Sequence, residues 1–298
     1  MEVRMNQLRV LLGLGVVFLS AGCVASTPRT PTEDDRASVE WNSIARSSSA
    51  QEAGSDSEAE LAKKLSNPVA SLVSVPIQVN VDKGIGPSDA DRTTTNVQPV
   101  IPFSISEGWN LITRTIVPII DAEAPAPGLS DRSGVGDVLE SLFFSPKEPT
   151  SSGWIWGAGP ALLLPTASDD ALGREKWSIG PTAVFLRQES GWTYGALSNH
   201  LWSVAGEEGR SDVNATFLQP FVSYTTKTHT TLGLNAESTY DWNEDEWTVP
   251  VNVTVAQLLK VGKLPISLTA GYREYVEAPS GGPDWGLRFA ITLLFPKR

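Results

Sequence analysis

The stretch that decides the fold is Trp285-Gly286-Leu287-Arg288-Phe289-Ala290-Ile291-Thr292-Leu293-Leu294-Phe295. Every second residue from Leu287 to Phe295 is large and apolar, whereas the residues between them are charged, small or polar, with Leu294 as the exception. Alternation over this length predicts a β-strand with one apolar and one polar face. A final strand that presents bulky apolar groups and ends on an aromatic residue is typical of barrels that face lipid. We therefore interpret 285–295 as the strand that closes a membrane barrel.

Composition excludes several classes of protein. The formal net charge of −11 and the pI near 4.7 argue against nucleic-acid binding, which requires clustered Lys and Arg. The mean hydropathy of −0.10 resembles that of soluble proteins, but alternating strands hide their lipid-facing side from such an average. After residue 23 no apolar run reaches about 18 residues, which excludes a helical membrane protein. The two histidines lie far apart and no cysteine pair or EF-hand pattern occurs, so we expect no metal and no cofactor.

The N-terminal region predicts export. Arg4 and Arg9 precede an apolar run over 10–20 that is too short to span a bilayer, so we interpret residues 1–22 as a signal peptide. Two cleavage sites stay open: before Cys23, whose thiol would then carry lipid, or after Ala25. Residues 23–56 are rich in Ser, Thr, Pro and charge and predict a disordered periplasmic tether. A capping-box pattern at Ser57 then predicts a short helix over 57–68, either in the barrel mouth or exposed.

From residue 69 to 298 the period of two predicts an all-β, transmembrane antiparallel β-barrel. The clearest alternation is Val73, Val75, Ile77, Val79 and Val81 against polar neighbours. Similar patterns give about twelve strands, an even number as bacterial barrels require. The remaining strands are expected around 97–105, 109–119, 134–145, 153–165, 177–188, 192–204, 213–225, 230–241, 247–260, 264–276 and 285–295.

The connections between these strands alternate in length, as they do in outer-membrane barrels. Short turns are expected around 106–108, 146–152, 189–191, 227–229 and 261–263, and longer loops over 83–91, 121–133, 166–176, 205–212, 242–246 and 277–284. Both termini are therefore expected in the periplasm. Tryptophans stand near strand ends, which predicts two interfacial belts. Prolines inside the predicted strands each remove a ladder donor, so we expect local breaks there.

Several segments also resemble a known group of proteins. They are 61–68 (LAKKLSNP), 98–102 (QPVIP), 141–147 (SLFFSPK), 154–157 (WIWG) and 237–242 (ESTYDW). From about Leu61 to the C-terminus the chain is similar to Gram-negative outer-membrane proteins filed as transporters close to the "MetA-pathway of phenol degradation" group, some of which carry the name neuromedin U. This resemblance implies an outer-membrane barrel inserted by the barrel assembly machinery, in contact with lipid and lipopolysaccharide. It supplies no catalytic motif.

Assigning the bulky apolar side of each strand to lipid leaves a set of polar residues that are expected to face inward. A charge on the lipid face near the midplane costs about 2 to 4 kcal/mol, which favours the inward side for the arginines. Two interpretations stay open: Arg and Glu pair and brace the barrel, or they line a narrow path for small, apolar or aromatic solutes. The candidates are Gln78, Asn80, Asn96, Gln98, Arg114, Glu140, Asn235, Glu237, Asn252, Arg273 and Arg288.

An enzyme is not expected, although one constellation supports an outer-membrane lipid hydrolase as an alternative. Ser198 and His200 share a strand face on either side of Asn199, as a Ser-His-Asn site would require. His229 is expected in a solvated turn. The acidic clusters at 169–170, 207–208 and 244–246 predict a negative rim, which either only keeps the loops solvated or bridges through divalent ions to lipopolysaccharide.

Overall fold

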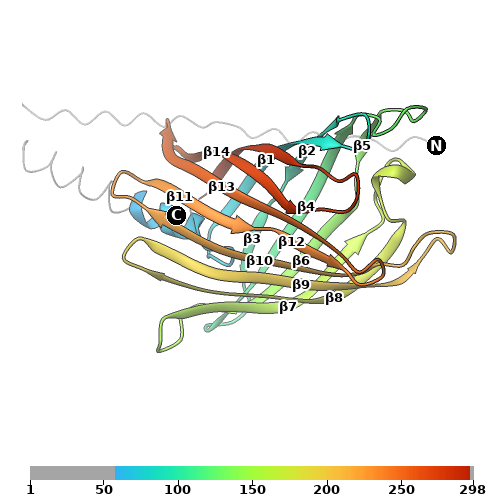
Figure 1. Cartoon of the computed structure of the whole chain (residues 1–298). Helices are drawn as coiled ribbons and strands as arrows, with labels where there is room; N and C mark the ends of the chain where they lie inside the picture. Colours follow the sequence, from blue (N-terminus) through green and yellow to red (C-terminus); the bar gives the residue numbers. More distant parts are fainter. Residues whose placement is uncertain (1–57, 296–298) are drawn as a thin grey trace, which may run out of the picture. The chain divides into compact units, whose positions relative to one another are not determined.

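A computed structural model describes residues 58–295 of the chain (Figure 1). The signal peptide over 1–22, the tether over 23–56 and the lipidation candidate Cys23 lie outside the described residues and stay predictions. Within the described part, one antiparallel sheet holds fifteen strands. They are β1 (Val73–Ile85), β2 (Ala90–Val97), β3 (Val100–Ser104), β4 (Trp109–Ala122), β5 (Arg132–Val135), β6 (Val138–Pro146), β7 (Trp154–Leu164), β8 (Lys176–Glu189), β9 (Trp192–Gly206), β10 (Asn214–Thr225), β11 (Thr230–Ala236), β12 (Ser238–Asp241), β13 (Glu246–Val261), β14 (Leu264–Glu277) and β15 (Trp285–Phe295).

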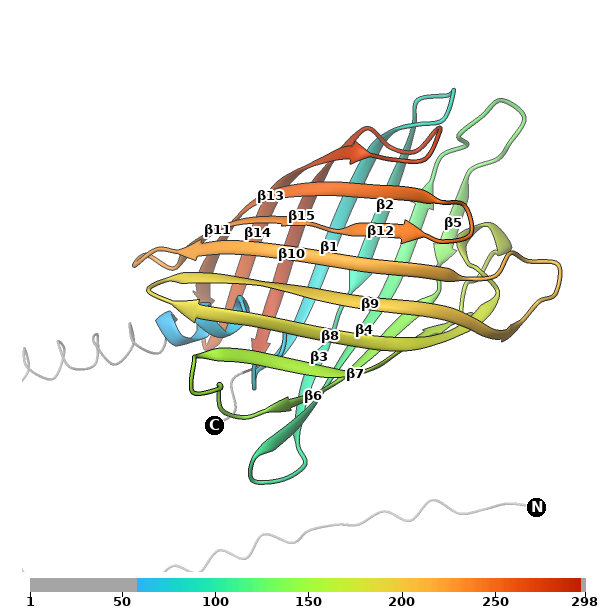
Figure 2. The ribbon, with the colours of Figure 1, turned by 60° about the horizontal axis from the view of Figure 1, so that its bottom comes forward.

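The sheet closes on itself. The last strand, β15, pairs with the first from Val73↔Phe295 to Lys83↔Trp285, and every other strand pairs with its neighbours in chain order. Three wall positions are each divided into two collinear segments, namely β2 with β3, β5 with β6, and β11 with β12. Fifteen segments therefore form a closed barrel of twelve strands (Figure 2), which confirms the predicted fold class.

Prolines explain the divided strands, as the sequence predicted. Pro99 separates β2 from β3, and the ladders beside Pro118 and Pro250 are interrupted where β5 gives way to β6 and β11 to β12. A proline lacks the N–H that one neighbour needs but keeps its carbonyl. The carbonyls of Pro118 and Pro250 accept from Gly136 and Glu237 across these gaps. The pairing with one of the two neighbouring strands is also interrupted at Pro76, Pro160, Pro181 and Pro220.

Side chains alternate between the two sides of the wall with the predicted period. On β15 the Phe289 side chain is 50% exposed on the outer surface, whereas Arg288 next to it is 5% exposed. The outer surface of the barrel carries Ile, Leu, Val and aromatic residues, as contact with lipid requires. Among the described residues no helix is long and apolar enough to cross a membrane.

The two ends of the barrel differ in their connections. Short turns join β3 to β4, β6 to β7, β8 to β9, β10 to β11 and β13 to β14, and we call this the turn end. The opposite, loop end carries the longer connections, including residues 165–175 with a 3-10 helix at Asp170–Leu172. The predicted long loops over 83–91 and 121–133 are each several residues shorter than expected: β1 and β2 are joined by 86–89, and β4 and β5 by 123–131. In both hairpins the paired strands extend into residues that the sequence assigned to the loops.

Exposed aromatic residues gather near both strand ends. At the turn end the rings of Trp109 and Trp156 meet edge to face at 5.7 Å, and Trp192 lies 5.0 Å from Tyr224. At the loop end a chain of ring contacts joins Trp202, His200, Trp242, Tyr240 and Trp247. Tryptophan and tyrosine favour the boundary between lipid and water, so the two groups correspond to interfacial belts.

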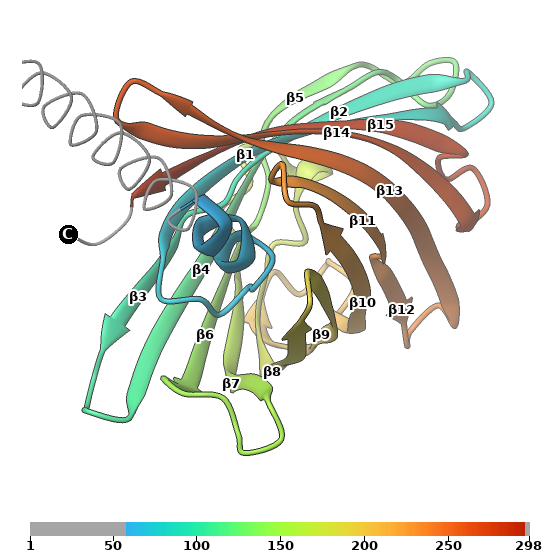
Figure 3. The same ribbon diagram turned by 90° about the vertical axis from the view of Figure 1, so that its left-hand side faces the viewer.

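Residues 58–72 fill the turn end of the barrel, and we call this segment the plug. Residues 58–65 are helical, and Figure 3, which looks into this end, shows the helix within the ring of strands. Leu61, Ala62, Ala70 and Leu72 of the plug pack on Leu258 and Leu294 of the wall. Further along, Val69 packs among Ile112, Phe143, Val184, Leu186 and Leu197. Of the two positions left open for the helix, the structure has the one in the barrel mouth.

Candidate functional site

An ionic belt lines the interior along adjacent strands, nearer the loop end than the turn end, and consists of Asp82, Glu237, Arg273 and Arg288. Arg288 binds Glu237 in a bidentate pair, with both N···O distances at 2.8 Å. Arg273 contacts the same carboxylate and also reaches Asp82 at 3.3 Å. Glu237 stands in the gap between β11 and β12, where its backbone N–H donates to the carbonyl of Pro250. The proline gap therefore sets the position from which one carboxylate binds two arginines.

Amide side chains surround the ionic belt and satisfy the remaining donors. Arg288 Nε donates to Asn80 at 2.8 Å, and Arg273 Nε donates to Asn252 at 3.0 Å. The Asn252 amide in turn donates to Asn235 at 3.0 Å. Buried ionic groups are stable only when their hydrogen bonds are complete. This network therefore braces β1, β11, β13, β14 and β15 against each other.

Arg114 lies outside this network. It extends from β4, and its guanidinium donates to Gln98 Oε1 at 3.0 Å. Among the described residues no carboxylate lies within ion-pair distance of Arg114, whereas Arg273 and Arg288 both have carboxylate partners. Gln98 belongs to the proline gap between β2 and β3, which turns its amide toward the interior. Arg114 is therefore a charged group whose described partner is a neutral amide.

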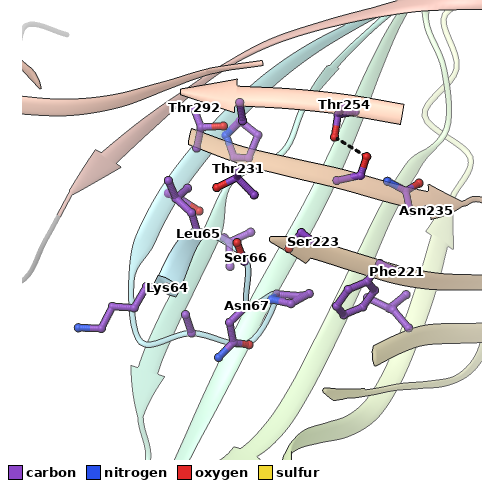
Figure 4. A pocket seen from close by; sticks show the side chains of 18 of the residues that line it. Lys64, Leu65, Ser66, Asn67, Phe221, Ser223, Thr231, Asn235, Thr254 and Thr292 are labelled. Atoms are coloured by element: carbon purple, nitrogen blue, oxygen red, sulfur yellow. Dashed lines mark hydrogen bonds between the residues drawn. The ribbon is translucent and has the colours of Figure 1, made fainter. Parts of the chain in front are cut away.

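A cavity of about 350 Å³ lies beside the plug, and its lining residue Gln219 contacts Glu237 of the ionic belt. Figure 4 shows side chains that line this cavity. Its apolar lining includes Leu65 and Leu72 of the plug and Phe221 of the wall. Its polar lining includes Arg114 and Gln98. Threonines and amides on the remaining wall, such as Thr231, Thr254, Thr292, Asn235 and Gln219, supply further donors and acceptors. Plug and wall therefore both contribute apolar groups to the cavity, and most of its polar groups come from the wall.

The structure places the inward candidates as follows. Asn80, Gln98, Asn252, Arg273 and Arg288 are buried, and Arg114, Asn235 and Glu237 join the contacts described above. Gln78 lies next to Asn80 and donates to it at 3.5 Å. Asn96 is paired with Gln78 and Pro118 in the ladder, on the same side of the wall.

Glu140 differs from the other candidates. On β6 the buried side chains are Ser141, Phe143 and Ser145, so Glu140 points to the opposite, outer side together with exposed Phe144. There its carboxylate accepts a hydrogen bond of 2.5 Å from Thr115. The inward expectation for Glu140 is therefore corrected. Phe143 faces inward because Val69 of the plug gives it an apolar partner. The sequence pattern assigns bulky apolar side chains to the lipid side, so it predicts the opposite orientation for this strand.

The Ser198 and His200 side chains do share a face, but it is the outer one. Ser198 Oγ donates to the carbonyl of Phe217 at 2.8 Å, and His200 Nδ1 lies 2.7 Å from Thr216 Oγ1. His200 Nε2 is buried without a hydrogen-bond partner, and the ring lies 4.1 Å from Trp202. A hydrolytic site needs a hydrogen bond between nucleophile and base. The arrangement around Ser198 lacks this bond.

His229 and the acidic loops lie at opposite ends. His229 Nδ1 is 3.7 Å from Glu58 of the plug, so this histidine contacts the plug. At the loop end several acidic residues pair with bases, including Asp169 with Arg132 and Asp212 with Lys176. No group of His, Cys, Asp and Glu among the described residues has the geometry of a metal site.

The outer surface carries an apolar groove of about 490 Å³ beside the gap at Pro220. Trp154, Phe185 and Tyr194 contribute aromatic rings to it. Phe221, Val222, Leu234 and Asn235 line both this groove and the lumen cavity, so the wall between them is one residue layer thick. Neither cavity was predicted from the sequence. Both depend on gaps between neighbouring strands, and the sequence alone does not show how the strands pair around the barrel.

Comparison with solved structures finds outer-membrane proteins that this chain resembles. With a TM-score of 0.59 and 17% identity, 75% of this chain matches 94% of a COG4313 outer membrane channel from Pseudomonas putida F1. The NanC porin matches with a TM-score of 0.46 and 10% identity over 76% of this chain and 100% of that chain. Outer membrane phospholipase A from Escherichia coli matches with a TM-score of 0.46 and 9% identity over 75% of this chain and 90% of that chain. No protein-family model and no curated protein matches the sequence. The likeness to the Pseudomonas putida channel shows that the chain has the fold of an outer-membrane β-barrel.

Proposed function

We propose that this protein is a narrow outer-membrane channel for small apolar or aromatic solutes, with both termini in the periplasm. The observation that carries the proposal is the lumen cavity of about 350 Å³ enclosed by the wall beside the plug. Its apolar lining suits a small ring or short chain, because ligand sites are mostly apolar with a few placed polar groups. The aromatic groove behind Phe221 and Leu234 supports the same solute class.

Conductance across a planar bilayer tests this function. The purified protein should give small, discrete openings, because the plug and the ionic belt leave a narrow path. Leu72→Asp should give larger or more frequent openings, since a carboxylate among Leu258 and Leu294 loosens the plug. Leu129→Asp is the matched control, because Leu129 is exposed in a loop. Silence of both the wild type and Leu72→Asp would reject the channel.

A bracing function is the second candidate, and the ionic belt is the observation that favours it. Arg273 and Arg288 share one carboxylate, as expected of groups that hold strands together rather than meet solutes. In a channel, Arg273→Gln should change the ion preference of the openings, since a charge in a narrow path dominates the local field. In a bracing barrel, liposomes stay tight to small aromatic solutes and the same substitution lowers only thermal stability.

A further inference from the structure

The lumen cavity carries an excess of positive charge. Its charged lining residues are Arg114 and Lys64, and its lining includes no Asp or Glu. Lys64 has its own partner, because its Nζ lies 2.9 Å from Glu60 on the plug helix. Arg114 has only the Gln98 amide as a described partner. The cavity is therefore electropositive at Arg114.

The neighbouring ionic belt compensates this charge only in part, because Glu237 attracts Arg114 from a distance but is already paired with Arg273 and Arg288. Arg273 and Arg288 contribute two positive charges, and Glu237 and Asp82 contribute two negative charges. Gln219 stands between the cavity and Glu237, to which its amide donates at 3.4 Å. The belt is thus neutral in itself, and Arg114 is left as one net positive charge in a largely enclosed space.

The chemistry of Arg114 selects the class of ligand that fits. A guanidinium presents five N–H donors in a planar fork that matches a carboxylate, and one of them is occupied by Gln98. The rest of the cavity offers Leu65, Leu72 and Phe221 to an apolar group. We propose that Arg114 and Gln98 bind the carboxylate of a small monocarboxylic acid whose compact apolar tail lies against these apolar side chains of the plug and the wall. This inference rests on the proposed function and deepens it.

The acidic loop end does not oppose such a ligand at the site itself. From Arg114 to the end of β4 at Ala122 the strand rises roughly 26 Å, at about 3.3 Å per residue. Exposed charges are screened beyond about 8 Å at physiological salt. The field at the cavity is therefore governed by Arg114 rather than by the loops.

Binding of benzoate and of benzyl alcohol to the full mature protein in lipid nanodiscs tests the proposal. The two probes share a ring and differ in charge, and ligand-observed NMR titration gives both dissociation constants. The wild type should bind benzoate at least tenfold more tightly than benzyl alcohol. Arg114→Gln should weaken benzoate at least tenfold and leave benzyl alcohol unchanged. Arg132→Gln, which removes an arginine paired with Asp169 at the loop end, should alter neither constant.

A second variant keeps the test decisive if Arg114→Gln fails to fold. Arg114→Lys retains the charge without the planar fork, so it should still prefer benzoate but bind it less tightly than the wild type. Equal binding of the two probes by the wild type, or full benzoate affinity in a folded Arg114→Gln protein, would overturn the proposal. Binding needs no conductance. A channel without the preference therefore rejects only this inference, and a silent barrel that prefers benzoate rejects only the channel.

Discussion

Glu237 shows how one buried carboxylate holds two arginine side chains in place. Its carboxylate serves both Arg273 and Arg288, which lie 36 and 51 residues further along the chain. Period-two alternation predicts that these three side chains face the same way. Their meeting at one point depends on strand order and register around the whole barrel, which local sequence does not encode. Glu140 shows the converse, because β6 is apolar on both faces and alternation alone assigns its side wrongly.

Replacing Glu237 by Gln should destabilise the barrel. The substitution leaves two buried guanidinium groups without their shared carboxylate, and breaking a buried pair costs about 3 to 5 kcal/mol. The expected result is a lower denaturant midpoint, measured by tryptophan fluorescence in detergent micelles. Glu148→Gln is the control, because Glu148 is exposed in the connection from β6 to β7. An unchanged midpoint for Glu237→Gln would show that the ionic belt contributes no net stability.

The sequence predicts the helix of the plug but does not predict where the plug lies. The capping-box pattern at Ser57 predicts a short helix over 57–68, and the structure has one over 58–65. Its place inside the barrel depends on Leu258 and Leu294, which are distant in sequence. Ser71 adds a polar contact, since Asn110 of β4 donates to its hydroxyl at 2.8 Å. The plug is thus attached to the wall by both apolar packing and a hydrogen bond.

A disulfide between plug and wall tests whether the plug must move. Ser71→Cys combined with Asn110→Cys, in a Cys23→Ser background, places two thiols where side chains already touch. The oxidised protein should show fewer or smaller bilayer openings, and a reducing agent should restore them, because the bond holds the plug in the mouth. The single Ser71→Cys variant should respond to neither reagent. Openings that persist in the oxidised protein would mean that ions pass beside a stationary plug.

At the scale of the whole molecule, two aromatic belts enclose an apolar outer surface, and the sequence predicted this distribution from tryptophans near strand ends. Lipids brominated at different chain positions measure how deep the rings lie. Bromine near the headgroups should quench the native fluorescence more than bromine at the chain ends, since Trp109, Trp192, Trp202 and Trp242 stand near the ends of their strands or just beyond them. Phe289→Trp adds a reporter on the outer surface in the middle of β15, and its additional fluorescence should be quenched most by bromine at the chain ends. Equal quenching of the added and the native tryptophans at every depth would contradict a barrel that spans the bilayer between these belts.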